Sequence, residues 1–147
     1  MDLRPHHVLD IVTSIGHDVE FRPHPYGHAV HTVAEAILAD TDLEATLVVA
    51  ADEICRPCVH LQPDGSCDDL RSSSRTSKQE YNDDLDRRLL EYLGLQAGAT
   101  MTVRQYLEIV NGKVPGIEAV CTHPPRDPQK RLAGLTRGLE KLGIRSA

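Results

Sequence analysis

The chain opens on Pro5-His6-His7-Val8-Leu9-Asp10-Ile11-Val12-Thr13-Ser14-Ile15-Gly16, a stretch that predicts its first helix. Apolar residues recur in it every three or four positions, which is the spacing of one helix face. Proline is favoured in the first turn of a helix, and Gly16 is a suitable end. We therefore expect an amphipathic helix over residues 5–16 whose apolar face packs against the rest of the chain.

The rest of the chain predicts four more helices and one strand at residues 46–50. Capping-box patterns begin at Ser77 and Thr102, where a hydroxyl can accept the third amide of the helix while Glu or Gln reaches back. In the last helix, Gly134 and Gly138 allow another backbone to approach closely. The four helices are expected from Tyr26 or Gly27 to Ala39, over 77–93, from Thr102 to just before Gly112, and from Asp127-Pro128 to Gly143. This pattern predicts one mostly α domain over residues 1–147, or an α+β domain if a small sheet forms.

Composition narrows the class of protein. The chain has 147 residues, 40% of them hydrophobic and 26% charged, which is typical of one soluble domain. It contains no apolar run long enough to cross a membrane and no signal-peptide pattern at its start, so we expect a cytoplasmic protein. Only one Phe, four Tyr and no Trp are present, and the net charge is −6. We therefore expect neither nucleic acid nor membrane among its partners, and the sequence leaves a redox or protein partner unidentified.

Four cysteines carry the strongest chemical signal. Cys55, Cys58 and Cys67 follow a C-x2-C-x8-C spacing on a turn-rich stretch, and Cys121 lies 54 residues further on. Four cysteines in a cytosolic chain are more typical of metal ligands than of disulfides. We expect a metal loop at about residues 51–74, closed by a segment at about 119–125 that supplies the fourth thiolate.

Two other interpretations of the cysteines stay open. They could be buried and inert, although three on one loop are unlike core packing. Cys55-Arg56-Pro57-Cys58 could be a redox dithiol, but that arrangement needs a helix to start at the first cysteine. Here Pro63-Asp64-Gly65 interrupts the segment too early for such a helix.

Histidines and carboxylates supply further candidates. A helix over this segment would place His28, His31 and Glu35 on one face, where they could bind zinc or non-haem iron, although a solvated face is the commoner outcome. His6 and His7 adjoin at the first helix and are candidate ligands or supporting groups. His60 and His123 each follow a cysteine by two residues and could replace a thiolate or hydrogen-bond a sulfur.

The stretch Leu3-Arg4-Pro5-His6-His7-Val8-Leu9, then Asp52-Glu53-Ile54-Cys55-x-x-Cys58 and Gly65-x-Cys67, resembles a family of small bacterial and archaeal proteins. The family is catalogued as a domain of unknown function and described as predicted iron–sulfur-binding. The resemblance covers roughly the first half of the chain, and more weakly Tyr92-Leu93-Gly94-Leu95. It implies that Cys55, Cys58 and Cys67 are cluster ligands.

One position departs from that family, which usually has a cysteine where this chain has Asp10. Either Asp10 supplies an oxygen ligand, or Cys121 takes the place, or a different metal is bound. Thiolate is the ordinary ligand of a cluster iron, which favours Cys121.

Three functions follow from these residues. The first is an iron–sulfur protein with an electron-transfer or redox-sensing role, using Cys55, Cys58, Cys67 and Cys121. The second is a structural zinc module built on the same thiolates. The third is a metalloenzyme that uses His28, His31 and Glu35.

Overall fold

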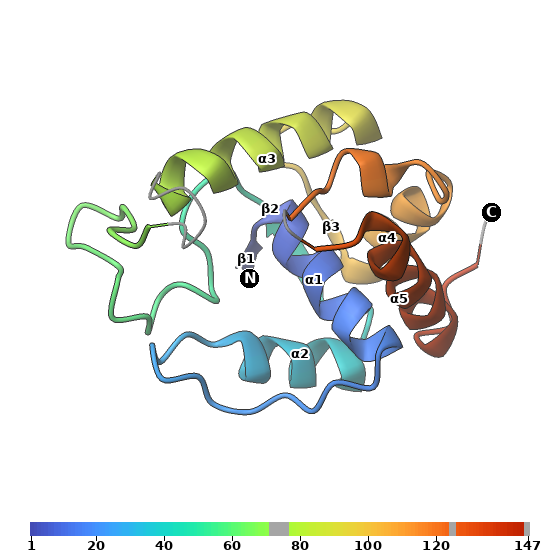
Figure 1. Cartoon of the computed structure of the whole chain (residues 1–147), viewed down its shortest axis with the longest axis horizontal. Helices are drawn as coiled ribbons and strands as arrows, with labels where there is room; N and C mark the ends of the chain where they lie inside the picture. The colour runs from blue at the N-terminus through green and yellow to red at the C-terminus, as the bar shows by residue number, and fades with distance from the viewer. Residues whose placement is uncertain (71–76, 124–125, 146–147) are drawn as a thin grey trace.

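The computed structural model describes residues 1–70, 77–123 and 126–145, and α1 (Pro5–Gly16) lies at the centre of this part. Figure 1 shows α3 (Lys78–Leu93) along one side of α1 and α2 (Val30–Ala39) along the opposite side, with α5 (Pro128–Lys141) against its C-terminal half. Nine of the twelve residues of α1 are buried. The predicted amphipathic helix is therefore surrounded on most of its circumference, and its two histidines are buried or half-buried with it.

The contact between α1 and α5 depends on glycines. A Cβ on Gly16 would collide with the carbonyl oxygen of Gly134, and one on Gly138 would collide with the carbonyl oxygen of Val12. The two backbones thus meet without intervening side chains. This confirms that the Gly134 and Gly138 pair admits a neighbouring backbone.

A small sheet lies at the N-terminal end of α1. β1 (Asp2–Leu3) pairs in parallel with β2 (Glu44–Leu47), which pairs antiparallel with β3 (Thr100–Thr102). The predicted strand at 46–50 is thus shifted toward the N-terminus. β1 has two residues and β3 has three, so the strand pairing that defines β2 ends where these short strands end. Arg4 joins β1 directly to α1, which places the start of α1 at the end of the sheet.

The fold class is confirmed: within the described residues, five α-helices and a small sheet form a mostly α domain. Ser77 accepts a hydrogen bond from the Glu80 amide at the start of α3, and Gly94 ends that helix at a φ of 70°. Thr102 and Gln105 form the predicted capping box of α4 (Val103–Asn111). Asp127 caps α5, and a short 3-10 helix, η1 (Ile117–Ala119), precedes Cys121.

α2 begins later than the sequence predicts. It starts at Val30, because Gly27 adopts a φ of 77° and its amide closes a turn onto the His24 carbonyl at 2.8 Å. His28 therefore precedes the helix. The expected helical face of His28, His31 and Glu35 is wrong in this respect, and only His31 and Glu35 lie on α2.

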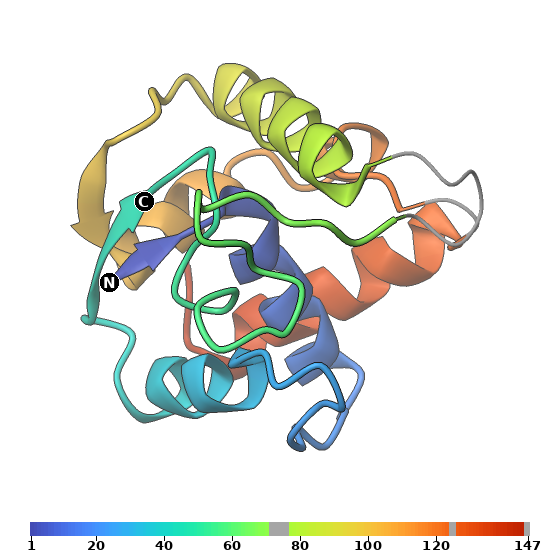
Figure 2. The same ribbon diagram turned by 90° about the vertical axis from the view of Figure 1, so that its left-hand side faces the viewer.

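Residues 51–70, which carry Cys55, Cys58 and Cys67 and which we call the cysteine loop, follow β2 and cover the N-terminal end of α1 (Figure 2). Residues 71–74 of the predicted metal loop lie outside the described residues, as do residues 124–125 of the predicted closing segment. Among the helices that the structure describes, none combines the length and apolar character that a membrane crossing requires.

Candidate metal centre

His6 and His7 lie side by side at the start of α1, and each is fixed by a buried carboxylate. Their ring centroids are 4.4 Å apart. His6 Nδ1 lies 2.8 Å from Asp86 Oδ1, and His7 Nδ1 lies 2.8 Å from Asp52 Oδ2. A carboxylate on one ring nitrogen is the usual support for a histidine that binds metal through the other. Both imidazoles are thus held in the manner of metal ligands.

Asp52 connects the cysteine loop to the start of α1. Its carboxylate accepts the amide of Arg4 at 2.7 Å, as well as the amides of Ile54 at 3.1 Å and Cys55 at 3.3 Å. Burial raises the pKa of Asp52, but the charge of His7 and these hydrogen bonds outweigh it and lower the pKa to about 2. Asp52 is therefore an anion that orients the cysteine loop.

Cys55 completes the first group of ligand atoms, which we call the loop-side group: His7, Asp52 and Cys55. Their candidate ligand atoms all lie within 4.8 Å of one another. Burial and the neighbouring charge of Asp52 raise the pKa of the Cys55 thiol to about 12. At neutral pH this thiol is therefore protonated. A bound metal would displace the proton and leave a thiolate.

Backbone hydrogen bonds join Cys55 to the next two cysteines step by step. The Cys58 amide donates to the Cys55 carbonyl at 2.9 Å, and the Leu61 amide donates to the Cys58 carbonyl at 3.1 Å. Leu61 then pairs with Cys67 in an antiparallel bridge. All three are free, half-buried thiols. The loop residues 53–57 form turns instead of a helix, which disfavours the redox-dithiol alternative.

Cys121 belongs to a second group, the helix-side group: Asp10, Cys121 and His123. The carboxylate, thiol and imidazole atoms of these three residues also lie within 4.8 Å of one another. His123 Nε2 is 3.3 Å from Asp10 Oδ1 and 3.9 Å from Cys121 Sγ. The two residues considered as alternatives for one fourth ligand, Asp10 and Cys121, thus lie together.

Charge in the helix-side group is balanced by Arg131 of α5, whose Nη2 lies 2.7 Å from Asp10 Oδ1 and 3.9 Å from Cys121 Sγ. Burial would raise the pKa of Asp10, but His123, His6 and Arg131 hold it well below its ordinary value. Burial and Asp10 raise the pKa of the Cys121 thiol to about 12.

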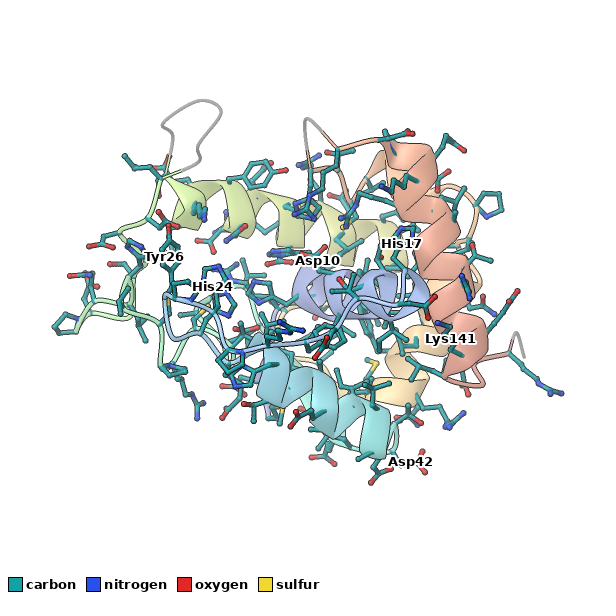
Figure 3. All side chains as sticks on the ribbon, turned by 60° about the horizontal axis from the view of Figure 1, so that its bottom comes forward. Asp10, His17, His24, Tyr26, Asp42 and Lys141 are labelled. Atoms are coloured by element: carbon teal, nitrogen blue, oxygen red, sulfur yellow. The ribbon has the colours of Figure 1, made fainter. Side chains whose placement is uncertain are left out.

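His6 connects the two groups. Its ring contacts His7 of the loop-side group, and its centroid lies 5.7 Å from that of His123 in the helix-side group. Figure 3 shows Asp10 on α1 and, nearer the cysteine loop, His24 and Tyr26. The convergence of all four cysteines on one centre stays a prediction, since the two groups that contain a cysteine hold Cys55 and Cys121 separately.

The family described as "Protein of unknown function (DUF1284)" matches residues 24–124, more than half of the chain. The chain belongs to this family. The DUF1284 match contains all four cysteines and begins after His6, His7 and Asp10. Its description states no activity, and no curated protein or solved structure matches the chain.

The remaining histidine candidates of this DUF1284 protein lie around the cysteine loop. His60 Nδ1 lies 2.8 Å from Asp68 Oδ1, so that nitrogen already has a carboxylate partner. His28 Nδ1 and His31 Nδ1 are buried without a hydrogen-bond partner. Neither of the two ligand groups found in the described part of the chain includes Glu35.

Sequence reasoning missed the charged residues beneath the histidines. Asp86 accepts the His6 amide at 2.9 Å and Arg4 Nη1 at 2.9 Å, and Arg4 Nη2 reaches Asp83 at 2.7 Å. A signal for Asp86 existed, because it lies on the apolar face of α3. The leucines of that face are Leu85, Leu89, Leu90 and Leu93. Arg4 belongs to the Leu3-Arg4-Pro5-His6-His7 stretch that carries the family resemblance, whereas no local pattern distinguishes Arg131.

The depressed pKa of Asp52 predicts acid sensitivity of the metal-free DUF1284 protein. A carboxyl whose pKa is lower in the folded state contributes stability above its ordinary pKa and loses it as the pH falls through the folded value. Between about pH 5 and pH 2, we expect Asp52 to account for a loss of about 2 kcal/mol. Urea unfolding with a chelator present measures this loss, which should shrink in Asp52→Asn. Equal pH slopes for the two proteins would contradict the assignment.

Proposed function

We propose that this protein binds an iron–sulfur cluster on the cysteine loop, with Cys55, Cys58 and Cys67 as thiolate ligands and His7 as the fourth ligand. The observation that carries the proposal is the position of Cys55. Its thiol shares the loop-side group with His7, and its carbonyl begins the turn that leads to Cys58. Cys121 has Asp10, His123 and Arg131 as neighbours instead, so His7 is the better fourth ligand.

The donor set fits such a group. Iron–sulfur clusters are held by cysteine thiolates, and histidine replaces cysteine at some irons. A cluster is larger than a single ion and holds its ligand sulfurs further apart, so it suits three thiols spread over successive turns.

The chain's own residues would set the properties of that centre. Asp52 holds His7 by one ring nitrogen and orients the Cys55 backbone. Metal binding would release the Cys55 proton, so the affinity would rise with pH. When bound, an iron–sulfur cluster supplies one-electron redox chemistry, and we assign the protein an electron-transfer or redox-sensing role.

A structural zinc ion is the second candidate, and the ligand set itself favours it. Three cysteines and one histidine are a common donor set of structural zinc. Zinc at Cys55, Cys58, Cys67 and His7 would join the cysteine loop to α1 and make the protein a regulatory or interaction module.

Anaerobic purification followed by absorption spectroscopy and assays of iron, zinc and acid-labile sulfide separates the two candidates. We expect a brown protein with iron and sulfide, and at least a tenfold loss of both in Cys55→Ser, Cys58→Ser and Cys67→Ser. Cys121→Ser is the matched control and should keep the cluster. A colourless protein with zinc lost in the same three variants would establish the second candidate. Unchanged metal content in the Cys55→Ser variant would reject both.

The role of His7 is tested separately. His7→Cys should retain the cluster because it restores an all-thiolate set, whereas His7→Ala should lower the cluster content and shift its absorption. Equal cluster content and spectra in His7→Ala and the unmodified protein, with loss in Cys121→Ser, would make Cys121 the fourth ligand.

A further inference from the structure

We propose that Asp10, Cys121 and His123 form a second metal site, which binds one divalent transition-metal ion such as zinc independently of the loop centre. A single ring nitrogen of His123 contacts both of the other residues. Its Nε2 faces both the Asp10 carboxylate and the Cys121 sulfur. In a nucleophile–histidine–carboxylate triad, the two partners would instead contact opposite ring nitrogens. Three donor atoms facing one point are the arrangement of a metal site.

The distances suit an ion. With zinc bonds of about 2.0–2.1 Å to nitrogen and oxygen and about 2.3 Å to sulfur, the edges of a tetrahedral site are about 3.3 Å for N–O and about 3.5 Å for N–S. The corresponding distances here are 3.3 Å from His123 to Asp10 and 3.9 Å from His123 to Cys121. Small side-chain movements would therefore complete the geometry.

Arg131 occupies the cation position in the metal-free chain. Its guanidinium contacts the Asp10 carboxylate and the Cys121 sulfur, two of the three proposed ligands. A divalent ion bound to the Asp10 carboxylate and a Cys121 thiolate would balance both charges without Arg131. The arginine and the metal are thus alternative occupants, and binding the metal requires the guanidinium to move away.

A neighbouring cavity gives the arginine somewhere to move and the ion a path of entry. This cavity, of about 430 Å³, lies between α1 and the start of α5 and is bordered by both Asp10 and Arg131. Charged side chains of Arg126, Asp127 and Lys130 also line it. Of the three proposed ligands, Asp10 borders this cavity, so solvent can reach the ion from that side and fill a fourth position, as in catalytic zinc sites.

Zinc is the probe that tests the site. The full-length protein is saturated with zinc, desalted and analysed for metal, and its affinity is measured by competition with a chromophoric chelator. We expect Cys121→Ser to bind one zinc fewer per chain, and Asp10→Asn to bind that ion at least tenfold more weakly. Asp64→Asn changes an exposed carboxylate outside both ligand groups and is the matched control for Asp10→Asn, so it should bind zinc as the unmodified protein does. Circular dichroism of each variant confirms that it is folded.

Arg131→Gln distinguishes a metal site from a merely structural cluster. Removing the competing cation should tighten zinc binding about tenfold, whereas loss of a structural contact would leave it unchanged or weaker. The proposal is overturned if Arg131→Gln does not tighten binding, or if Cys121→Ser keeps the full zinc content. The loop centre is judged on Cys55→Ser, so failure of either proposal is recognised independently of the other.

Discussion

Replacing Asp86 by asparagine is expected to lower the free energy of unfolding by about 3–5 kcal/mol. Asp86 is fully buried and serves three donors: the Arg4 guanidinium, the His6 amide and the His6 ring. Arg4 is 2% exposed, and of its two carboxylate partners in the described part of the chain it would keep Asp83 alone. The substitution therefore leaves a buried cation undercompensated, which costs far more than a surface ion pair contributes.

Asp84 provides the matched control for Asp86. It lies on the same helix, two residues earlier, and pairs with Arg88 at 3.0 Å while its side chain is 68% exposed. Asp84→Asn should change stability by less than about 0.5 kcal/mol. Urea denaturation of both variants, with the m-value compared, measures the difference. Similar midpoints for the two variants would show that the Asp86 network contributes little to the folded state.

The Asp86 network also shows why the site was only partly predictable. The four cysteines were visible in the sequence because their residue type and spacing carry the signal. The sequence does not show which cysteines lie close together in the fold, because that depends on the position of α1 between the loops that carry them. Asp10 follows His6 by one helical turn, so the two lie on one side of α1 near His123, while His7 is turned toward Asp52 and Cys55. The separation into two groups thus follows from tertiary packing.

The helices were predictable for a different reason. Their ends carry local chemistry that acts within a few residues, such as the Thr102 and Gln105 capping box and the left-handed Gly94. β1 and β3 carry no such signal, because strands of two or three residues show no alternation and exist only through pairing with β2. The late start of α2 likewise depends on the Gly27 turn against the cysteine loop, where the Ala29 amide donates to the Ile54 carbonyl at 2.9 Å.

The glycine contact between α1 and α5 leads to the second large prediction, for Gly138→Ala. In an exposed helix this change would stabilise by about 1 kcal/mol, because glycine is the poorer helix former. Here the added methyl would collide with the carbonyl oxygen of Val12, and it would also lie 2.8 Å from Val12 Cγ1 and 2.9 Å from the Val12 backbone carbon. Backbone atoms of a packed helix cannot yield as a flexible side chain does, so the helices must separate. We expect a net loss of about 3 kcal/mol and a fall in Tm of about 10 °C.

Gly112→Ala tests whether that loss comes from the collision or from glycine replacement as such. Gly112 is exposed, has a φ of −69° and offers a new Cβ its nearest contact at 3.4 Å, so its substitution should be close to neutral. Thermal unfolding of both variants makes the comparison.

The helix-side group adds a second readout, because Asp10 lies on α1 and Arg131 on α5. If Gly138→Ala moves α5 away from α1, the distance between Arg131 and Asp10 must increase. Arg131 would then compete less strongly with zinc for Asp10, and zinc affinity should rise. A Gly138→Ala protein as stable as Gly112→Ala would mean that the two helices tolerate a wider spacing than their backbone contact implies.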